Sequence, residues 1–415
     1  MPTSARTPTI PRRARRVYRT LRAERRTLEQ GVAALALSTA AGFVAGLILG
    51  SITGTLELLP GLLVLIPASV GMRGMIFGAM GARLGTGIAA GVFEPTVRRG
   101  SLLGQNVEVA IISAVLSSFY LAGMAKLVAS SFGEDTISFW DLVTISVVGG
   151  VIASAVILVV TVVLSVQSFR RGWDLDAVST PMVTAIGDMI TLPALFLATF
   201  IVRNEAANAI VAGACAAAAL GALLWAILRS SREVQRTLIE MAGVSALAPI
   251  LDIFAGAVLE AHRTELEAIP GILILIPPFI SQAGAIGGIL SSRLSSKLQL
   301  GVITPRGRPE RPAVTDATIV VTLGLIVFTV IGVVAAVLAS VTGVARPPAG
   351  LMVAGTVLAG VLVLPVTLVV GYYVAVLTTR FGLDPDNHGV PTITATLDLT
   401  GVAAVLFVMS ILGVT

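Results

Sequence analysis

Two aspartates occupy equivalent places in two long apolar segments. Asp188 and Asp398 each lie seven residues after a proline, and a threonine, Thr184 or Thr394, precedes each of them by four residues. Residues four apart share one face of a helix, so hydroxyl and carboxyl point the same way, about 10 Å from the proline at 1.5 Å per residue. In a membrane-spanning helix, ionisable side chains are costly and mark ion pathways.

Two such carboxylates facing one axis repel each other unless a cation lies between them, which suits a divalent ion. The pattern therefore predicts a metal site formed by Asp188, Asp398, Thr184 and Thr394. In the alternative interpretation each aspartate is protonated and bonded to a neighbouring helix. That alternative does not explain why both segments keep the aspartate in the same register.

Further acids flank the two aspartate segments. Four of them precede the aspartate helices in predicted cytoplasmic loops: Asp174, Asp176, Asp384 and Asp386. Acids at the inner mouth of a pore would concentrate cations or bind a regulatory cation, while ordinary loop and N-cap chemistry is the alternative. Glu57 and Glu267 occupy the matching outer position and are predicted to attract cations from outside.

Pro67 and Pro277 lie inside predicted helices. A proline there removes one backbone donor and frees the carbonyl four residues earlier, at Leu63 and Leu273. Irregular backbone at membrane depth is tolerated where it lines a watery cavity. These residues are therefore predicted to line a pore, with a simple kink that aids packing as the alternative.

The overall composition places the chain in a membrane. Of its 415 residues, 55% are hydrophobic and 12% are charged, whereas soluble domains carry about 25% charged residues. Soluble enzymes, nucleic-acid-binding folds and secreted disulfide-rich proteins are thereby excluded. The single cysteine, Cys215, excludes an intrachain disulfide, and with only two histidines the sequence argues against a His/Cys metal cage.

A bilayer core about 30 Å thick needs about 20 apolar residues per helix. Eleven stretches qualify: 31–54, 60–82, 106–131, 142–167, 181–202, 206–228, 237–259, 270–292, 316–341, 350–378 and 391–414. The fold expected is an all-α polytopic membrane protein of about 11 transmembrane helices.

Basic residues predict the orientation of these spans. Nine arginines lie in the first 30 residues, and most others gather in alternate loops, while Arg203, Arg263 and Arg346 fall on the opposite side. The N-terminus is therefore predicted to be cytoplasmic and the C-terminus outside, in the cell membrane. The basic tail is expected to bind anionic lipid headgroups rather than nucleic acid.

The chain repeats itself at an offset of 210 residues. Residues 60–95 and 270–305 align without a gap, and so do 172–191 and 382–401, so that Asp188 matches Asp398. Arg73 and Asp252 depart from the repeat, since Ala283 and Gly42 stand at their equivalent positions. Arg73 is expected to pair with an acid, and Asp252 is a secondary candidate for the site.

Each copy has five spans, and the extra span between them makes the copies parallel. The predicted units are a basic tail (1–30), a first five-helix module (31–205), a linking transmembrane helix (206–230) and a second five-helix module (231–415). Parallel repeats imply a pseudo-two-fold axis along the membrane normal, which is a natural place for a pore.

The run from Pro67 to Gly91, its copy from Pro277 to Gly301, and the two segments that end in Asp188 and Asp398 resemble the MgtE magnesium transporter family. The similarity is greater to its two-module form, the solute-carrier magnesium transporters of eukaryotes and their archaeal relatives. The resemblance implies an Mg²⁺-conducting pore between the modules, with Asp188 and Asp398 binding the ion. Mg²⁺ is then the transported substrate, with no organic cofactor, and one chain supplies both halves, so a monomer is expected.

Three alternatives belong to other classes. One is a coupled carrier or exchanger for another divalent metal, and another is a transporter for a small organic solute. The third is an intramembrane aspartyl protease, which also needs two aspartates. Proteases do not require equivalent aspartates in tandem copies, so the sequence predicts a transporter and not an enzyme.

Overall fold

The computed structural model describes residues 25–133, 136–171, 175–382 and 389–414, and every regular element in these ranges is a helix. The first copy contributes α2 (Arg25–Ser51), α3 (Thr53–Leu58), α4 (Leu62–Ala89), α5 (Leu102–Ser131), α6 (Phe139–Arg171) and α7 (Leu175–Val202). Next comes α8 (Glu205–Leu228). The second copy contributes α9 (Arg232–Ala261), α10 (Arg263–Ala268), α11 (Pro270–Gln299), α12 (Arg311–Thr342), α13 (Ala349–Phe381) and α14 (Val390–Ile411).

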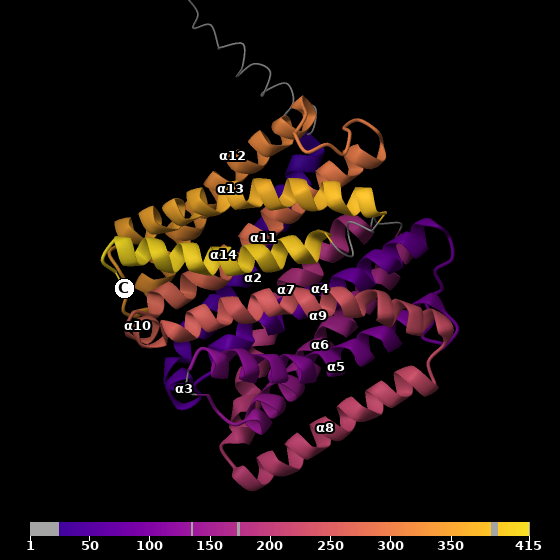
Figure 1. The fold of residues 1–415 in the computed structure, drawn as a ribbon, viewed down its shortest axis with the longest axis horizontal. Helices are drawn as coiled ribbons and strands as arrows, with labels where there is room; N and C mark the ends of the chain where they lie inside the picture. Colours follow the sequence, from indigo (N-terminus) through magenta and orange to yellow (C-terminus); the bar gives the residue numbers. More distant parts are fainter. Residues whose placement is uncertain (1–24, 134–135, 172–174, 383–388, 415) are drawn as a thin grey trace, which may run out of the picture.

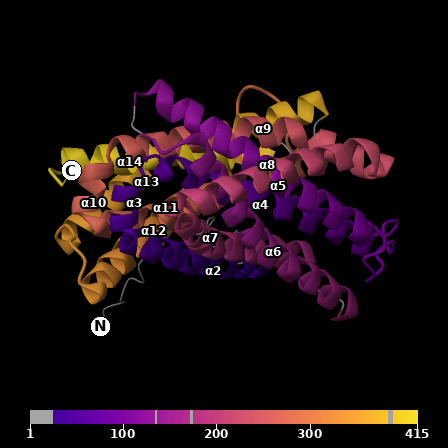
Figure 2. The same cartoon turned by 90° about the horizontal axis from the view of Figure 1, so that it is seen from below.

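Ten of the described helices, α4 to α9 and α11 to α14, contain spans long and apolar enough to cross a bilayer. The first predicted span corresponds to α2, whose apolar part among the described residues, Leu35–Ser51, is shorter. The long helices run roughly side by side, with α3, α10 and the C-terminus at one end of the bundle (Figures 1 and 2). The prediction of an all-α polytopic membrane protein is therefore confirmed.

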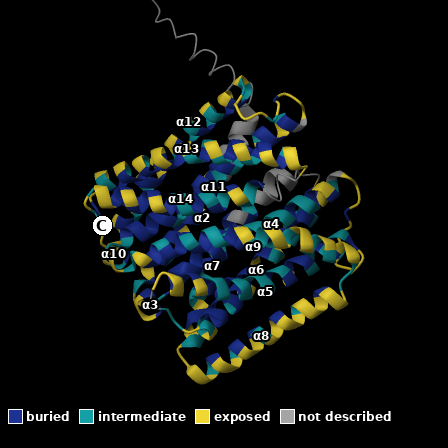
Figure 3. Cartoon of the chain, in the orientation of Figure 1, coloured by how far each residue is buried: buried dark blue, intermediate teal, exposed yellow. Residues whose placement is uncertain are grey.

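Helices equivalent at the 210-residue offset make equivalent contacts. In each copy the last helix packs on the first and second long helices, so α7 contacts α2 and α4, and α14 contacts α9 and α11. Helix α8 has no counterpart in the repeat and lies at the edge of the bundle (Figure 1). Much of its surface is exposed (Figure 3), as expected of a helix that faces lipid.

The two copies interlock through their first helices. Helix α2 packs on α11 of the second copy, and α9 packs on α4 of the first. A Cβ atom at Gly46 would lie 2.3 Å from the carbonyl oxygen of Ile274, and one at Gly256 would lie 2.4 Å from that of Val64. Both crossings therefore need glycine, because small residues let helix backbones approach closely.

We expect Gly256→Ala to lower the free energy of unfolding by about 1–3 kcal/mol, since overpacking of a tight contact costs that much. Gly243→Ala is the matched control, because Gly243 lies on the same helix and no atom stands within 4 Å of a Cβ placed there. Thermal unfolding in detergent measures the difference. Equal melting temperatures for the two variants would show that the crossing tolerates a side chain.

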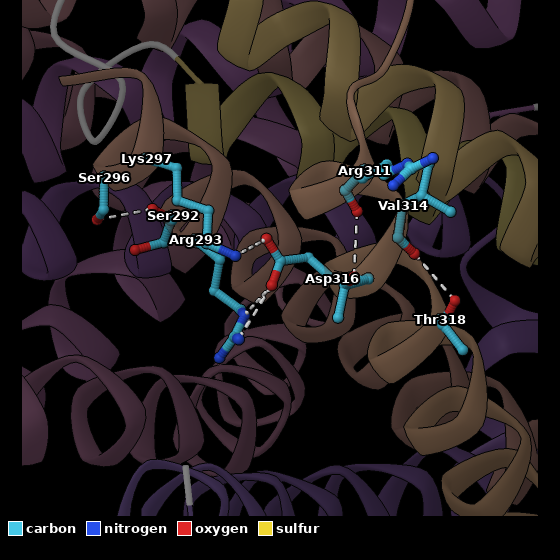
Figure 4. Close-up of polar contacts among 9 residues, drawn as sticks. Ser292, Arg293, Ser296, Lys297, Arg311, Val314, Asp316 and Thr318 are labelled. Atoms are coloured by element: carbon cyan, nitrogen blue, oxygen red, sulfur yellow. Dashed lines mark hydrogen bonds and ion pairs between the residues drawn. The ribbon is translucent and has the colours of Figure 1, made fainter. Parts of the chain in front are cut away.

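A buried ion-pair cluster joins α11 to α12. Asp316 is fully buried and lies 3.0 Å from Arg293 and 2.5 Å from Lys297 (Figure 4). At the equivalent place in the first copy, the Arg83 Nε donates to the Asn106 side chain at 2.6 Å. Both copies thus use one arginine to tie the second long helix to the third, with a carboxylate in one copy and an amide in the other.

Candidate functional site

Asp188 and Asp398 are both buried inside the helix bundle. Asp188 lies on α7 and Asp398 on α14, and their side chains are only 7% and 6% exposed. The carboxyl of Asp252, on α9, interacts with that of Asp398, which also feels the negative charge of Asp188. Three helices from both copies therefore deliver three acids to one buried region.

The helix that carries Asp188 begins earlier in the chain than the position of Pro181 predicted. Pro391 opens α14 as expected, but α7 begins at Leu175, six residues before Pro181. Asp188 consequently lies about 20 Å from the start of α7 at 1.5 Å per residue, which is deeper than the 10 Å expected. A proline can open a helix, but it does not exclude a preceding turn.

Asp188 receives a hydrogen bond from a helix of the other copy. The Ser281 hydroxyl on α11 donates to Asp188 Oδ2 at 2.8 Å, and it also contacts the Ser38 hydroxyl on α2 at 3.0 Å. The adjacent Gln282 donates from Nε2 to the carbonyl of Leu35 at 3.2 Å. Sequence reasoning missed these polar residues, because a serine in an apolar helix carries no signal that tells where its hydroxyl points.

Asp252 is 1% exposed, and its Oδ1 has no hydrogen-bond partner among the described residues. Its other oxygen lies against Gly71 on α4, where an added Cβ would be 2.6 Å away. At the equivalent position in the first copy, Gly42 lies against Pro278, and a Cβ there would be 2.7 Å from the proline Cα. In the second copy the space beside Gly71 accommodates the Asp252 carboxylate. In the first copy Pro278 leaves no room for a side chain at position 42.

Of the two threonines predicted for the metal site, the structure describes the side chain of Thr394. Its hydroxyl donates to the Val390 carbonyl one turn earlier, at 3.0 Å. The side chains of Thr184 and Asp176 lie outside the described part of the chain, as do Asp174, Asp384 and Asp386 altogether.

The two acids predicted for the outer mouth lie near one another at the end of the bundle that carries α3 and α10. Glu57 is exposed and Glu267 is half-buried, with Arg263 3.8 Å from the Glu267 carboxylate. Partial burial raises the pKa of Glu267, the Arg263 charge opposes this, and the negative charge of Glu57 adds to the rise. The cation beside the Glu267 carboxylate in the structure is the guanidinium of Arg263.

Pro67 and Pro277 lie inside α4 and α11, as predicted. Leu63 and Leu273 are both fully buried. The Leu63 amide donates to the buried carboxylate of Glu260 at 3.2 Å, and a Cβ at Gly256 would lie 2.7 Å from the Leu63 carbonyl oxygen. This backbone segment thus lies at the crossing of α4 and α9, and its part in a pore stays a prediction.

Arg73 is 2% exposed and donates to the Ser69 carbonyl at 2.6 Å and to the Ser118 hydroxyl at 3.0 Å. It was expected to pair with an acid, but the contacts found among the described residues are with uncharged oxygens. A Cβ at Gly150 would lie 2.2 Å from its Nη2, so α6 leaves room for the guanidinium.

Asp398 interacts with both of the other buried acids, Asp252 and Asp188. Among the described residues, no group of three or more acid, histidine or cysteine side chains is placed to hold a metal ion. Mg²⁺ dehydrates reluctantly and is usually held by one or two carboxylates with several of its waters in place. A site with one or two carboxylates suits an ion that keeps part of its water shell.

Comparison with known proteins gives matches that follow the repeat. The profile of the MgtE family, described as a divalent cation transporter, matches residues 66–198 and again residues 276–408. Solute carrier family 41 member 3 of Mus musculus is 24% identical over 358 residues, which cover 82% of this chain and 73% of that protein. The Rattus norvegicus protein of the same name is 23% identical, covering 82% and 77%.

Solute carrier family 41 member 2 of Mus musculus is 24% identical over 255 residues, which cover 60% of this chain and 44% of that protein. No solved structure matches the chain. The two matched segments of the family profile begin and end at positions that correspond at the 210-residue offset, so each copy is matched over the same helices.

Proposed function

The chain belongs to the MgtE family of divalent cation transporters, and from that premise we propose that it conducts Mg²⁺ between its two five-helix copies, with Asp188 and Asp398 holding the ion. The observation that supports this most is that both carboxylates, one from each copy, are buried and that Asp398 feels the negative charge of Asp188. Buried like charges are costly, and a divalent cation between them offsets that cost.

The ion remains partly hydrated in this proposal. Two carboxylates and the Ser281 hydroxyl offer hard oxygen ligands, which Mg²⁺ prefers to thiols and imidazoles. Because binding must be weak enough for release, a site without a complete cage serves transport better than one with it. Thr184, Thr394 and the carbonyls of Leu63 and Leu273 are proposed to contact the water shell along the path.

The proposed orientation of the chain and the membrane potential favour inward movement of the ion. We place the N-terminal tail in the cytoplasm against anionic headgroups, and α3 and α10 at the outer face of the cell membrane. A negative-inside potential contributes about 2.3 kcal/mol per charge per 100 mV, hence about twice that for Mg²⁺. Influx then needs no coupled ion, and one chain suffices because it supplies both halves.

At the two mouths, acids are proposed to concentrate cations. Glu57 and Glu267 serve the outer mouth, while Asp174, Asp176, Asp384 and Asp386 serve the inner mouth, where they also have the chemistry to sense cytoplasmic Mg²⁺.

Glu57→Gln should lower Mg²⁺ uptake about two- to fivefold at low ionic strength, and by less at high salt, since the attraction is screened. Glu205→Gln is the matched control, because Glu205 is also exposed and lies on the same predicted side, at the start of α8. Uptake rates at sub-saturating Mg²⁺ give the comparison. A loss that does not change with salt would contradict the role of Glu57 in attracting cations.

The proposed transport is tested with purified protein in proteoliposomes. Fluxes of Mg²⁺, Mn²⁺, Co²⁺, Ca²⁺ and Na⁺ are measured with and without a membrane potential. We expect Mg²⁺ to enter and the potential alone to accelerate it. Uptake that requires an opposing Na⁺ or H⁺ gradient would favour the second candidate, a coupled carrier, and an absence of divalent flux would contradict the proposal.

A further inference from the structure

The two aspartates of the proposed site have different neighbours. Asp188 accepts a hydrogen bond from the Ser281 hydroxyl, whereas the carboxyl of Asp398 interacts with that of Asp252. The residue equivalent to Ser281 is Gly71, and the Asp252 carboxylate fills the space that the missing side chain of Gly71 leaves. The group beside Asp188 is thus the Ser281 hydroxyl of α11, whereas the group beside Asp398 is the Asp252 carboxylate of α9.

Asp252 interacts with another acid, Asp398, whose negative charge opposes its own. Its Oδ1 is buried without a hydrogen-bond partner, and no basic side chain among the described residues forms an ion pair or hydrogen bond with it. Two polar side chains on the helices that pack on α9 have other partners. Arg73 on α4 donates to Ser118, and the Tyr120 hydroxyl on α5 donates to the Ala246 carbonyl.

We propose that Asp252 places a third negative charge beside the two-aspartate ion site, in the second copy alone, and that this charge sets the discrimination between divalent and monovalent cations. This inference rests on the proposed function. A fixed negative charge attracts a divalent ion twice as strongly as a monovalent ion at the same distance. For ions that share the same path, a third negative charge beside the two aspartates therefore raises the affinity for Mg²⁺ more than the affinity for Na⁺.

The asymmetry is imposed by packing. An acid at position 42 would collide with Pro278, so the first copy has no room for the equivalent carboxylate. The ion is consequently held closer to Asp398 and Asp252 than to Asp188, although the two pseudo-equivalent aspartates are chemically identical.

The test compares Asp252→Asn with Glu233→Gln, an exposed acid on the same helix, in the full-length protein. Mg²⁺ binding is measured by titration calorimetry in detergent, alone and against Na⁺. We expect Asp252→Asn to bind Mg²⁺ about ten- to a hundredfold more weakly, as typical for loss of a supporting ligand group, and to become sensitive to Na⁺. Wild-type affinity and wild-type Na⁺ tolerance would overturn the inference.

A second variant guards against loss of folding. Asp252→Gly combined with Gly71→Ser reproduces the arrangement of the other half, where a serine hydroxyl faces the aspartate. It fills the space but removes the charge, so we expect it to fold and to lose Na⁺ tolerance as Asp252→Asn does. Wild-type behaviour of this variant would show that Asp252 only fills space. If Asp188→Asn and Asp398→Asn also bind Mg²⁺ normally, the proposed function itself fails, which is a distinct result.

Discussion

Asp188→Asn should reduce Mg²⁺ uptake into proteoliposomes by about a hundredfold, which corresponds to about 2.7 kcal/mol of barrier. Asparagine keeps the size of the side chain and can still accept the hydrogen bond from Ser281, but it removes the charge that attracts the ion. We expect Asp398→Asn to cause a comparable loss. The double variant should be little worse than either single one, because groups that act as a unit are not additive.

Asp141→Asn is the control for this substitution. Asp141 lies in the first turn of α6, where it accepts from the Ser138 amide and the Asn208 side chain. We expect uptake by this variant within about twofold of wild type, since single charges outside the proposed path contribute little. Wild-type uptake by either site variant would contradict the assignment of that aspartate.

The largest expected effect on stability comes from Asp316→Leu. This change leaves Arg293 and Lys297 without their shared carboxylate, and removing one partner of a buried ion pair costs about 2–4 kcal/mol when the basic groups are partly exposed, as they are here. Thermal unfolding in detergent should therefore show a much lower melting temperature. An unchanged melting temperature would show that the cluster does not stabilise the fold.

The first copy supplies the matched control for that prediction. In the first copy Asn106 accepts a hydrogen bond from Arg83, at the position where Asp316 pairs with Arg293 in the second copy. Gly87 occupies the position equivalent to Lys297. Asp316→Asn combined with Lys297→Met should thus recover most of the stability that Asp316→Leu loses, because it recreates a single arginine–amide contact.

The repeat was the strongest signal in the sequence, and it predicted that α7 and α14 are equivalent and that each carries a buried aspartate, but it did not predict how far Asp188 lies from the start of α7. Alignment at a fixed offset shows which residues correspond, but it does not show which residues face one another. The interlocked crossings at Gly46 and Gly256, which bind the copies together, depend on helix tilt and were therefore not predicted.

The sequence also did not predict which side chains surround each aspartate. The Ser281 hydroxyl reaches Asp188 from the opposite copy, and Asp252 reaches Asp398 through the space at Gly71. Both contacts join residues far apart in the chain, so no local spacing rule applies. Arg73 was expected beside an acid because charges in lipid are usually paired, yet a carbonyl and a serine hydroxyl bind its guanidinium instead.

The central claim is that a divalent ion lies between the carboxylates of Asp188 and Asp398. The most direct measurement is a crystal structure of the protein soaked in Mn²⁺, with anomalous scattering used to locate the metal. We predict one anomalous peak between these two carboxylates, displaced toward Asp252, which disappears in the Asp188→Asn variant. A peak elsewhere in the membrane region, with none between these aspartates, would contradict the account.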